Sequence, residues 1–265
     1  MHPFPTLDAS STPPSSLPPL LLEHLSLHGA CLVTNLLPPA TLRRCNAAAE
    51  LLPLQAPEAS LSPSKRLSPG YVESSSRRYH LPLGDCRLPA VLSALSELEA
   101  ALAPLLPPFF AGAPHGRTQL QLLRSEPSPS SRAQRFHQDN TRRGLTFLVP
   151  LVDVPLRRGP TELLLGSHEL TCASRGSAAA LRELPGSLPR VARASDRRAP
   201  PLRAGDVLVY DCRVLHRGLA NRDKVARPVL VLRFDEEGWG PPGHGVLSTL
   251  VFAGLGRALA ALRWQ

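Results

Sequence analysis

The sequence predicts a mainly β protein, a sandwich or jelly roll with helices packed outside it. From about residue 117 onward, short apolar stretches alternate with joints of Gly, Pro and Asp, which is the pattern of strands and turns. Before that point, apolar residues recur at spacings of three and four, which favours helices. The sequence contains no repeat at a solenoid period, so a stacked-repeat fold is not indicated.

The N-terminal part is expected to contain two helices around a short strand. Residues 1–20 are rich in Ser and Pro, so we expect them to be disordered. A helix then ends at Gly29, "ACLVTNLL" follows as a strand, and "PATLRRCNAAAELL" forms a helix that begins with proline, a residue favoured at the first helical position. Apolar spacing predicts another long helix over residues 88–106.

The C-terminal part is expected to supply the sheets. The expected strands are "RTQLQLLRSE", "AQRFHQDN", "GLTFLVPLVDV", "TELLLGSH", "PLRAGDVLVYDCRVLHRG" and "RPVLVLRFD". Residues 169–203 form a long stretch with little strand pattern, which predicts an insertion or lid. The tail "LSTLVFAGLGRALAALRWQ" is expected to end as an amphipathic helix. We expect residues 21–265 to form a single domain.

Composition and charge narrow the class of protein. The formal net charge is +9, but 28 of the 30 basic residues are arginines spread along the chain as pairs, and aromatic residues make up 5%. This distribution disfavours a nucleic-acid platform. Five cysteines without CxxC spacing are typical of reduced thiols in an intracellular protein. No apolar run is long enough for a bilayer span and no secretory signal is evident, so we expect a cytoplasmic location.

One short motif, His137-Gln138-Asp139, is a candidate metal site. Side chains alternate along a strand, so His137 and Asp139 are expected on one face and Gln138 on the other. A non-haem Fe(II) oxygenase needs one imidazole and one carboxylate on one side, a second imidazole from elsewhere in the chain, and three open coordination positions. Roughly 0.3 such pairs arise by chance in a chain of this composition. The alternative is therefore a strand-end pair that caps a turn.

His216 and Arg227 are candidates to complete that site. His216 ends a strand that a Gly-Asp turn opens, and Arg227 begins the next strand. A hairpin across "GLANRDKVA" would make the two strands antiparallel neighbours. An arginine there can offer two parallel donors to a carboxylate. The alternatives are a core histidine bonded to the backbone and a surface arginine.

Several of these segments together resemble the phytanoyl-CoA dioxygenase family. They are the His137–Asp139 motif, "GPTELLLGSH", "GDVLVYDCRVLHRG" with Arg227, and the opening "HGACLVTNLLPP". The resemblance extends from about residue 21 to 236. It implies a double-stranded β-helix core (jelly-roll, cupin-like) and a non-haem oxygenase that depends on Fe(II) and the cosubstrate 2-oxoglutarate.

The resemblance also implies residue roles. His137, Asp139 and His216 match the metal ligands, which are the catalytic centre, and Arg227 matches the anchor of the 2-oxoglutarate distal carboxylate. The family often has a hydroxyl residue two positions after the distal histidine, where this chain has glycine. A hydroxyl contact to the cosubstrate from that position is therefore absent. We expect Thr146 or Gln121 to supply this contact instead, as a further cofactor-binding residue.

The implied reaction consumes O₂ and 2-oxoglutarate, releases succinate and CO₂, and hydroxylates a C–H bond. Halogenating relatives replace the ligand aspartate, and Asp139 is retained, so hydroxylation is favoured. The expected substrate is a small or lipid-like molecule. The sequence carries no signal for an oligomeric state.

Two other functions remain open at this point. A jelly-roll binding protein without turnover is one, although such proteins usually lose a ligand and this chain retains all three. A nucleic-acid-directed oxygenase of the same chemistry is the other, and arginines clustered at the pocket mouth would support it.

Five other polar residues lie near the motifs, and we expect them to have structural or supporting roles or to be exposed to solvent. We expect His168 to shape the rim of the barrel, and Arg78 and His80 to lie in a solvated loop, although an anionic contact would suit them. Arg213 and Asn221 are expected to support the distal histidine or to stabilise its loop.

Overall fold

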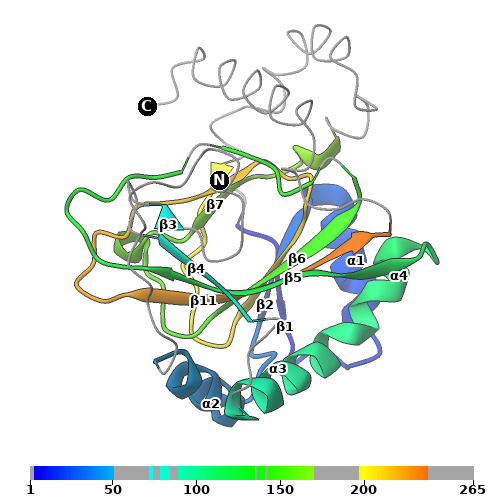
Figure 1. Ribbon diagram of the computed structural model, residues 1–265. Helices are drawn as coiled ribbons and strands as arrows, with labels where there is room; N and C mark the ends of the chain where they lie inside the picture. The colour runs from blue at the N-terminus through cyan, green and yellow to red at the C-terminus, as the bar shows by residue number, and fades with distance from the viewer. Residues whose placement is uncertain are drawn as a thin grey trace, which may run out of the picture.

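The protein is built from two β-sheets with helices along one side of the larger sheet (Figure 1). The computed structural model describes residues 3–50, 72–73, 78–83, 89–134, 136–140, 142–169 and 197–237. Within these ranges, eight strands form one sheet in the order β1-β2-β9-β6-β11-β5-β4-β3, and three strands form another in the order β10-β7-β8. The predicted mainly β class with flanking helices is confirmed.

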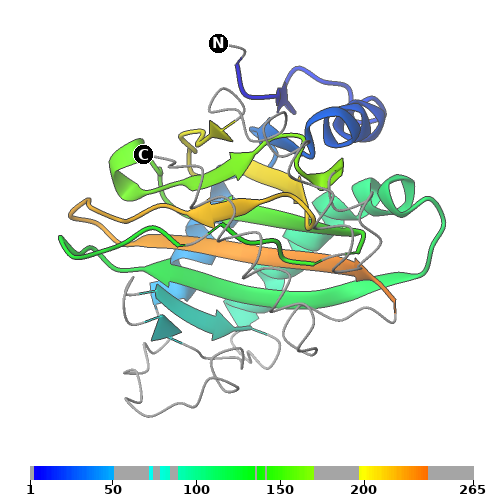
Figure 2. The same ribbon diagram turned by 90° about the horizontal axis from the view of Figure 1, so that it is seen from above.

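The larger sheet consists, in spatial order, of β1 (Thr6–Asp8), β2 (Ala30–Thr34), β9 (Val207–Asp211), β6 (Gly144–Pro150), β11 (Arg227–Glu236), β5 (His115–Ser125), β4 (Arg78–Pro82) and β3 (Val72–Glu73). The smaller sheet consists of β10 (His216–Gly218), β7 (Thr161–Leu164) and β8 (Arg197–Arg198). Strand β1 runs parallel to β2, and the other paired strands are antiparallel. Figure 2 shows β11, in orange, running beside β5, in green.

The helices are α1 (Leu17–His28), α2 (Pro39–Glu50), α3 (Pro89–Leu102) and α4 (Leu106–Phe110), with short 3₁₀ turns at η2 (Ala103–Leu105) and η3 (Leu156–Arg158). Helix α1 ends at Gly29, which adopts a left-handed conformation with φ of 74°. A Cβ at this position would also lie 2.5 Å from the His168 ring. Glycine is therefore required both by the backbone conformation and by the lack of space. The helix expected over residues 88–106 ends at Leu102, because Pro104 cannot donate the next helical hydrogen bond.

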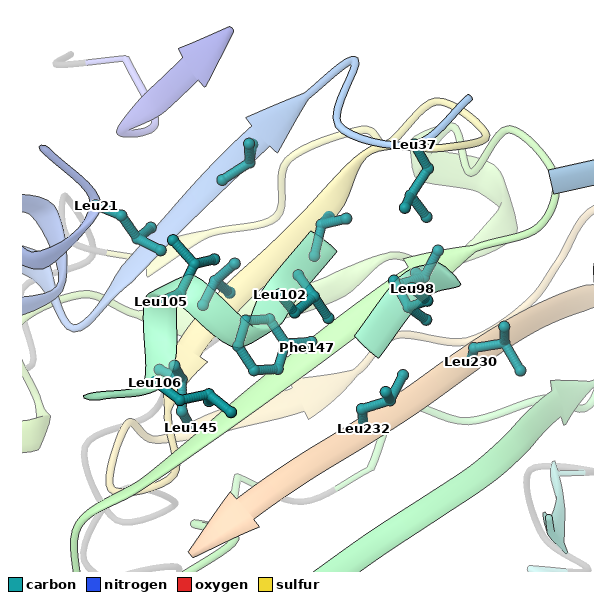
Figure 3. Close-up of a cluster of buried hydrophobic side chains, with 14 of the residues drawn as sticks. Leu21, Leu37, Leu98, Leu102, Leu105, Leu106, Leu145, Phe147, Leu230 and Leu232 are labelled. Atoms are coloured by element: carbon teal, nitrogen blue, oxygen red, sulfur yellow. The ribbon is translucent and has the colours of Figure 1, made fainter. Parts of the chain in front are cut away.

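The main hydrophobic core lies between the helices and the larger sheet (Figure 3). Alternate residues of each strand face it, as the two-residue period of a strand requires. Figure 3 labels ten of these side chains: Leu21, Leu37, Leu98, Leu102, Leu105, Leu106, Leu145, Phe147, Leu230 and Leu232.

The opposite face of the larger sheet contributes to a second, smaller core toward β7. Its members come from the intervening positions of the same strands and include Leu148, Leu208, Val229 and Val231. We call this the inner face, because it looks toward the smaller sheet, and we call the helix side the outer face.

The N-terminal lead differs from the expected disorder. Residues 6–8 form β1, which pairs with β2 in parallel and buries Leu7 in the main core. The Asp8 carboxylate accepts the main-chain N–H of Ser10 at 3.0 Å, which fixes the following turn. The high Ser and Pro content gave no indication of this short strand. The strand forms because the otherwise unpaired edge of β2 can bind it through main-chain hydrogen bonds.

Two expectations about the strands are wrong. The segment over residues 133–140 is not a regular strand and makes a single bridge at His137. Strands β10 and β11 are not hairpin neighbours, since His216 pairs with Leu163 of β7 and Arg227 pairs with Ser125 of β5. The chain crosses from the smaller sheet to the larger one between them.

Two predicted segments lie wholly or mainly outside the described residues. These are the insertion over residues 169–203, of which residues 169 and 197–203 are described, and the C-terminal amphipathic helix. In the described part of the chain, no helix has the length and apolar character needed to cross a bilayer.

Candidate metal centre

Three potential metal ligands meet between the two sheets. His137, Asp139 and His216 each place one ligand atom within 4.8 Å of the others. Main-chain hydrogen bonds set this arrangement: His137 N–H donates to His216 O, and His216 N–H donates to His137 O, both at 2.9 Å. The N–H of Asp139 donates to Cys212 O at 2.9 Å. The backbone therefore fixes the spacing of the three side chains.

The residue between the first two ligands turns away from them. Gln138 is buried, and its amide donates to the carbonyl of Arg213. His137 and Asp139 thus share a side as the sequence predicts, but an isolated bridge and not a regular strand produces the arrangement.

His216 is held in a state that can bind a metal. Its Nδ1 lies 3.0 Å from the carbonyl oxygen of Val214, which can only accept a hydrogen bond, so Nδ1 carries the proton and Nε2 keeps its lone pair. Burial lowers the pKa of His216 to about 4, so the imidazole is neutral at physiological pH. Nε2 lies 3.6 Å from Asp139 Oδ1.

Asp139 is oriented by four neighbours. Its Oδ2 accepts hydrogen bonds from the hydroxyls of Thr146 and Tyr210, both at 3.0 Å. Its Oδ1 faces His216 and, at 3.7 Å, the guanidinium of Arg233. Burial opposes ionisation, but His216, which is protonated in this acid range, and the charge of Arg233 outweigh it and lower the pKa of Asp139 to about 2. The carboxylate is therefore ionised, as metal ligation requires.

The sequence did not point to Arg233, which begins a series of buried polar contacts behind the ligand carboxylate. Its Nε lies 3.2 Å from Asp235 Oδ2. Asp235 also accepts a hydrogen bond from the side-chain amide of Asn140 at 2.8 Å and one from the Thr118 hydroxyl. Arg233 thus joins the ligand carboxylate to a second buried carboxylate. An arginine inside "RPVLVLRFD", a strand apolar on both faces, was the available signal, because a buried cation needs an acidic partner.

Arg227 is almost fully buried at the far end of β11, at 3% exposure. Its NH2 donates to Ser125 Oγ at 3.0 Å, and its NH1 lies 3.5 Å from the carbonyl oxygen of Leu219, three residues beyond His216. Its Nε is buried without a hydrogen-bond partner among the described residues. Burial, and after it the charge of Arg78, lowers the pKa of Arg227 to about 9. A surface position is excluded for this arginine.

The structure separates the two candidates for the additional cosubstrate contact. The Thr146 hydroxyl donates to Asp139 and lies 3.2 Å from Cys212 Sγ, so it sits beside the ligand carboxylate. Gln121 pairs with Val231 across β5 and β11. Because Val231 faces inward and paired residues share a face, Gln121 lies on the inner face too, and its role stays a prediction.

The expectation of a solvated loop is wrong for Arg78 and His80, which both lie on β4, where His80 pairs with Leu123. Arg78 begins this strand and is 1% exposed. Its Nε donates to Ser125 Oγ at 3.3 Å, and its NH2 donates to the carbonyl oxygens of Gly218 and Leu219, both at 2.8 Å. Arg78 therefore lies against the same backbone as Arg227.

The remaining polar residues stabilise loops. His168 is buried and its Nε2 lies 3.1 Å from the carbonyl oxygen of Ser26, which ties β7 to α1. Arg213 pairs with Asp211 at 2.5 Å. The amide of Asn221 donates to the carbonyl oxygens of Ser125 at 2.9 Å and Val225 at 3.0 Å. Asn221 thereby braces the crossing between the sheets.

Comparison with known families identifies the chain. The family model described as phytanoyl-CoA dioxygenase (PhyH) matches residues 25–229, which is more than half of the sequence. The chain belongs to the phytanoyl-CoA dioxygenase family. Membership, together with the His–Asp–His cluster, confirms the predicted class of enzyme, an Fe(II)- and 2-oxoglutarate-dependent dioxygenase. No protein of curated function is significantly similar to the chain in sequence.

Solved structures support the predicted jelly-roll core of this dioxygenase. The 2-oxoglutarate-dependent epimerase SnoN from nogalamycin biosynthesis matches with a TM-score of 0.60 at 20% identity, over 88% of this chain and 89% of its own. The carbocyclase SnoK from the same biosynthesis matches with a TM-score of 0.61 at 21% identity, over 85% and 86%. HygX from Streptomyces hygroscopicus, with nickel and 2-oxoglutarate bound, matches with a TM-score of 0.56 at 15% identity, over 83% and 87%. At these identities the likeness establishes the fold.

Proposed function

We propose that this dioxygenase hydroxylates a C–H bond of a small or lipid-like organic molecule and releases succinate and CO₂. The observation that carries the proposal is the convergence of His137, Asp139 and His216 within 4.8 Å, with the carboxylate ionised and His216 Nε2 free of its proton. Two imidazoles and a carboxylate are the ligand set of non-haem Fe(II) oxygenases. Bound Fe(II) would supply the activation of O₂.

The protein's own residues have distinct parts in this reaction. His137, Asp139 and His216 would hold the metal, and three protein ligands leave positions open for the keto-acid end of 2-oxoglutarate and for O₂. Thr146 and Tyr210 donate hydrogen bonds to Asp139 Oδ2, so Oδ1 would be the oxygen that holds the metal.

The cosubstrate would extend from the metal toward Arg227. That guanidinium is buried and has a spare donor at Nε, which suits the distal carboxylate of 2-oxoglutarate. The inner-face side chains Val229 and Val231 are apolar and exclude water from the space beside the cosubstrate.

The retained Asp139 supports hydroxylation over halogenation. A halogenating enzyme needs, for its halide, the coordination position that this carboxylate would fill. An epimerase and a carbocyclase share the fold, so the product must be identified directly. Hydroxylation adds one oxygen atom to the substrate, epimerisation leaves its mass unchanged, and oxidative ring closure removes two hydrogen atoms.

A small organic substrate is favoured over a nucleic acid. Two structures that share the fold contain nogalamycin RO and hygromycin B. In the described part of the chain, eight arginines are distributed among ion pairs with six different carboxylates. These pairs are Arg44 with Glu97, Arg117 with Glu99, Arg124 with Glu126, Arg157 and Arg158 with Asp223, Arg197 and Arg217 with Glu162, and Arg213 with Asp211.

The test is anaerobic loading with Fe(II) and 2-oxoglutarate, followed by O₂ and measurement of succinate. The His137→Ala and Asp139→Ala variants should lose metal binding and succinate formation, whereas His24→Ala on helix α1 should retain both. Equal succinate from wild type and the two ligand variants would contradict the proposal. A metabolite screen that follows the mass of each product then identifies the substrate and the reaction.

A further inference from the structure

Three buried polar side chains meet at one end of the inner face, one from each of three adjacent strands. Arg78 of β4 pairs with Ser125 of β5, which pairs with Arg227 of β11. Ser125 Oγ accepts a hydrogen bond from each arginine, at 3.3 Å from Arg78 Nε and 3.0 Å from Arg227 NH2. We call this group the two-arginine cluster. Each of its members is at most 3% exposed.

The charge on Arg227 is not balanced by an acidic side chain that the structure describes. Its hydrogen bonds go to the neutral oxygens of Ser125 and Leu219, and its Nε has no partner in that part of the chain. Among the described residues, Arg78, a second cation, adds to the effect of burial in lowering the pKa of Arg227. A buried guanidinium without an anion beside it is costly, so a bound anion would stabilise Arg227.

The cluster lies next to the distal metal ligand. Arg78 NH2 donates to the carbonyl oxygens of Gly218 and Leu219, two and three residues beyond His216. A Cβ on Gly218 would lie 2.8 Å from Arg78 NH2 and 3.0 Å from its central carbon. The guanidinium of Arg78 therefore fills the space into which any side chain at position 218 would project.

We propose that Arg78 and Arg227 together bind the distal carboxylate of 2-oxoglutarate, with Ser125 aligning them and with Arg78 in place of a side chain at position 218. The carboxylate would accept from two guanidiniums, which gives the site a stronger preference for an oxo acid with an acidic tail than one arginine provides. This inference depends on the proposed function, because it takes 2-oxoglutarate as the cosubstrate. It adds Arg78 and Ser125 as specificity-determining residues.

The test compares two oxo acids that share the chelating end. The full-length protein is loaded anaerobically with Fe(II) and titrated calorimetrically with 2-oxoglutarate or with 2-oxopentanoate, which has the same chain length and a methyl group in place of the distal carboxylate. Arg78→Gln keeps an amide donor but removes the charge. It should weaken 2-oxoglutarate binding by about thirtyfold or more, as expected for loss of one partner of a buried charged hydrogen bond, and leave 2-oxopentanoate binding nearly unchanged.

A matched control and a rescue variant separate binding from folding. Arg222→Gln removes the same charge at an exposed position and should change neither affinity. Arg78→Ala opens the space beside Gly218, so the double variant Arg78→Ala/Gly218→Ser should recover part of the 2-oxoglutarate affinity that Arg78→Ala loses. If Arg78→Gln does not fold, Ser125→Ala should reduce the preference for 2-oxoglutarate over 2-oxopentanoate.

The outcomes distinguish this inference from the proposed function. If the wild type binds neither oxo acid in the presence of Fe(II), the proposed function is wrong and the inference is wrong with it. If the wild type binds 2-oxoglutarate and Arg78→Gln leaves its affinity unchanged, only the role of Arg78 is overturned. Equal weakening of both oxo acids would also overturn that role, since it would make Arg78 a structural residue alone.

Discussion

The two faces of the larger sheet come from the same strands, but the inner face adds to its apolar residues the polar ones that surround the metal ligands. On β11, Leu230 and Leu232 face outward into the main core, whereas Arg227 and Arg233 occupy inner-face positions. On β6, Phe147 packs on the outer face and its neighbour Thr146 donates to Asp139 on the inner face. A single strand therefore serves stability with one set of residues and chemistry with the other.

This difference predicts that substitutions on the two faces of the sheet affect stability in different ways. The outer face gains free energy from apolar burial in proportion to the area removed from water. The inner face holds Arg233 and Asp235 away from water, and Asp139 in part, at an electrostatic cost that their pairing offsets. Outer-face variants should respond to packing alone, and inner-face variants should respond to bound cations.

One of the two largest expected effects is on the outer face. Phe147 is fully buried and packs edge-on against Phe234, with ring centroids 6.1 Å apart. Phe147→Ala should lower the free energy of unfolding by about 3–5 kcal/mol, as is typical for removal of a core aromatic ring. Urea denaturation measures this loss, and added Mn(II) or Fe(II) should not restore it. A loss below about 1 kcal/mol would show that this face is not tightly packed.

The matching inner-face variant is Arg233→Met, which leaves Asp139 and Asp235 without the cation between them. The metal-free protein should lose about 3–5 kcal/mol of unfolding free energy, as for a buried ion pair that loses one partner. A divalent metal supplies positive charge at the same place, so the metal-induced rise in Tm should be larger in this variant than in wild type.

Thermal denaturation with and without metal checks this expectation, and Arg233→Lys provides the control that retains the charge. An equal metal-induced rise in Tm in wild type and Arg233→Met would contradict the contrast between the two faces.

The smallest expected effect is that of Thr146→Val, a change of nearly equal volume beside Phe147. It removes one of two hydrogen bonds to Asp139 Oδ2, and Tyr210 still donates to that oxygen. The expected loss of unfolding free energy is about 0.5–1.5 kcal/mol. Calorimetric titration should show 2-oxoglutarate and 2-oxopentanoate affected alike. A loss specific to 2-oxoglutarate would place Thr146 at the distal carboxylate, and Gln121→Leu in the same assay tests the other candidate.

Much of the fold could be predicted from local pattern, because the elements obey short-range rules. Leu17, Leu21 and Leu25 recur at the spacing of one helical face, and Gly29 ends that helix as its left-handed conformation requires. Strand pairing was harder. The hairpin expected between His216 and Arg227 failed because the crossing between sheets depends on long-range contacts, such as those of Asn221 with Ser125, that carry no local signal.

The residues of the candidate site likewise differ in how far the sequence alone predicts them. His137 and Asp139 could be found from their spacing, and His216 and Arg227 from the family resemblance. The burial of Arg78 could not be predicted, since its surroundings in the sequence are polar and it is buried by pairing with Ser125 of a distant strand. Arg233 left a readable signal in its apolar strand, but its partner Asp139 lies almost a hundred positions earlier.

The bridge between His137 and His216 consists only of main-chain atoms. It does not depend on which side chains stand at those two positions. The backbone therefore sets the spacing of the two imidazoles, and the entropy of bringing these positions together is spent during folding. By the same reasoning, a descendant of this chain could lose either imidazole, and its reaction with it, while keeping the same architecture.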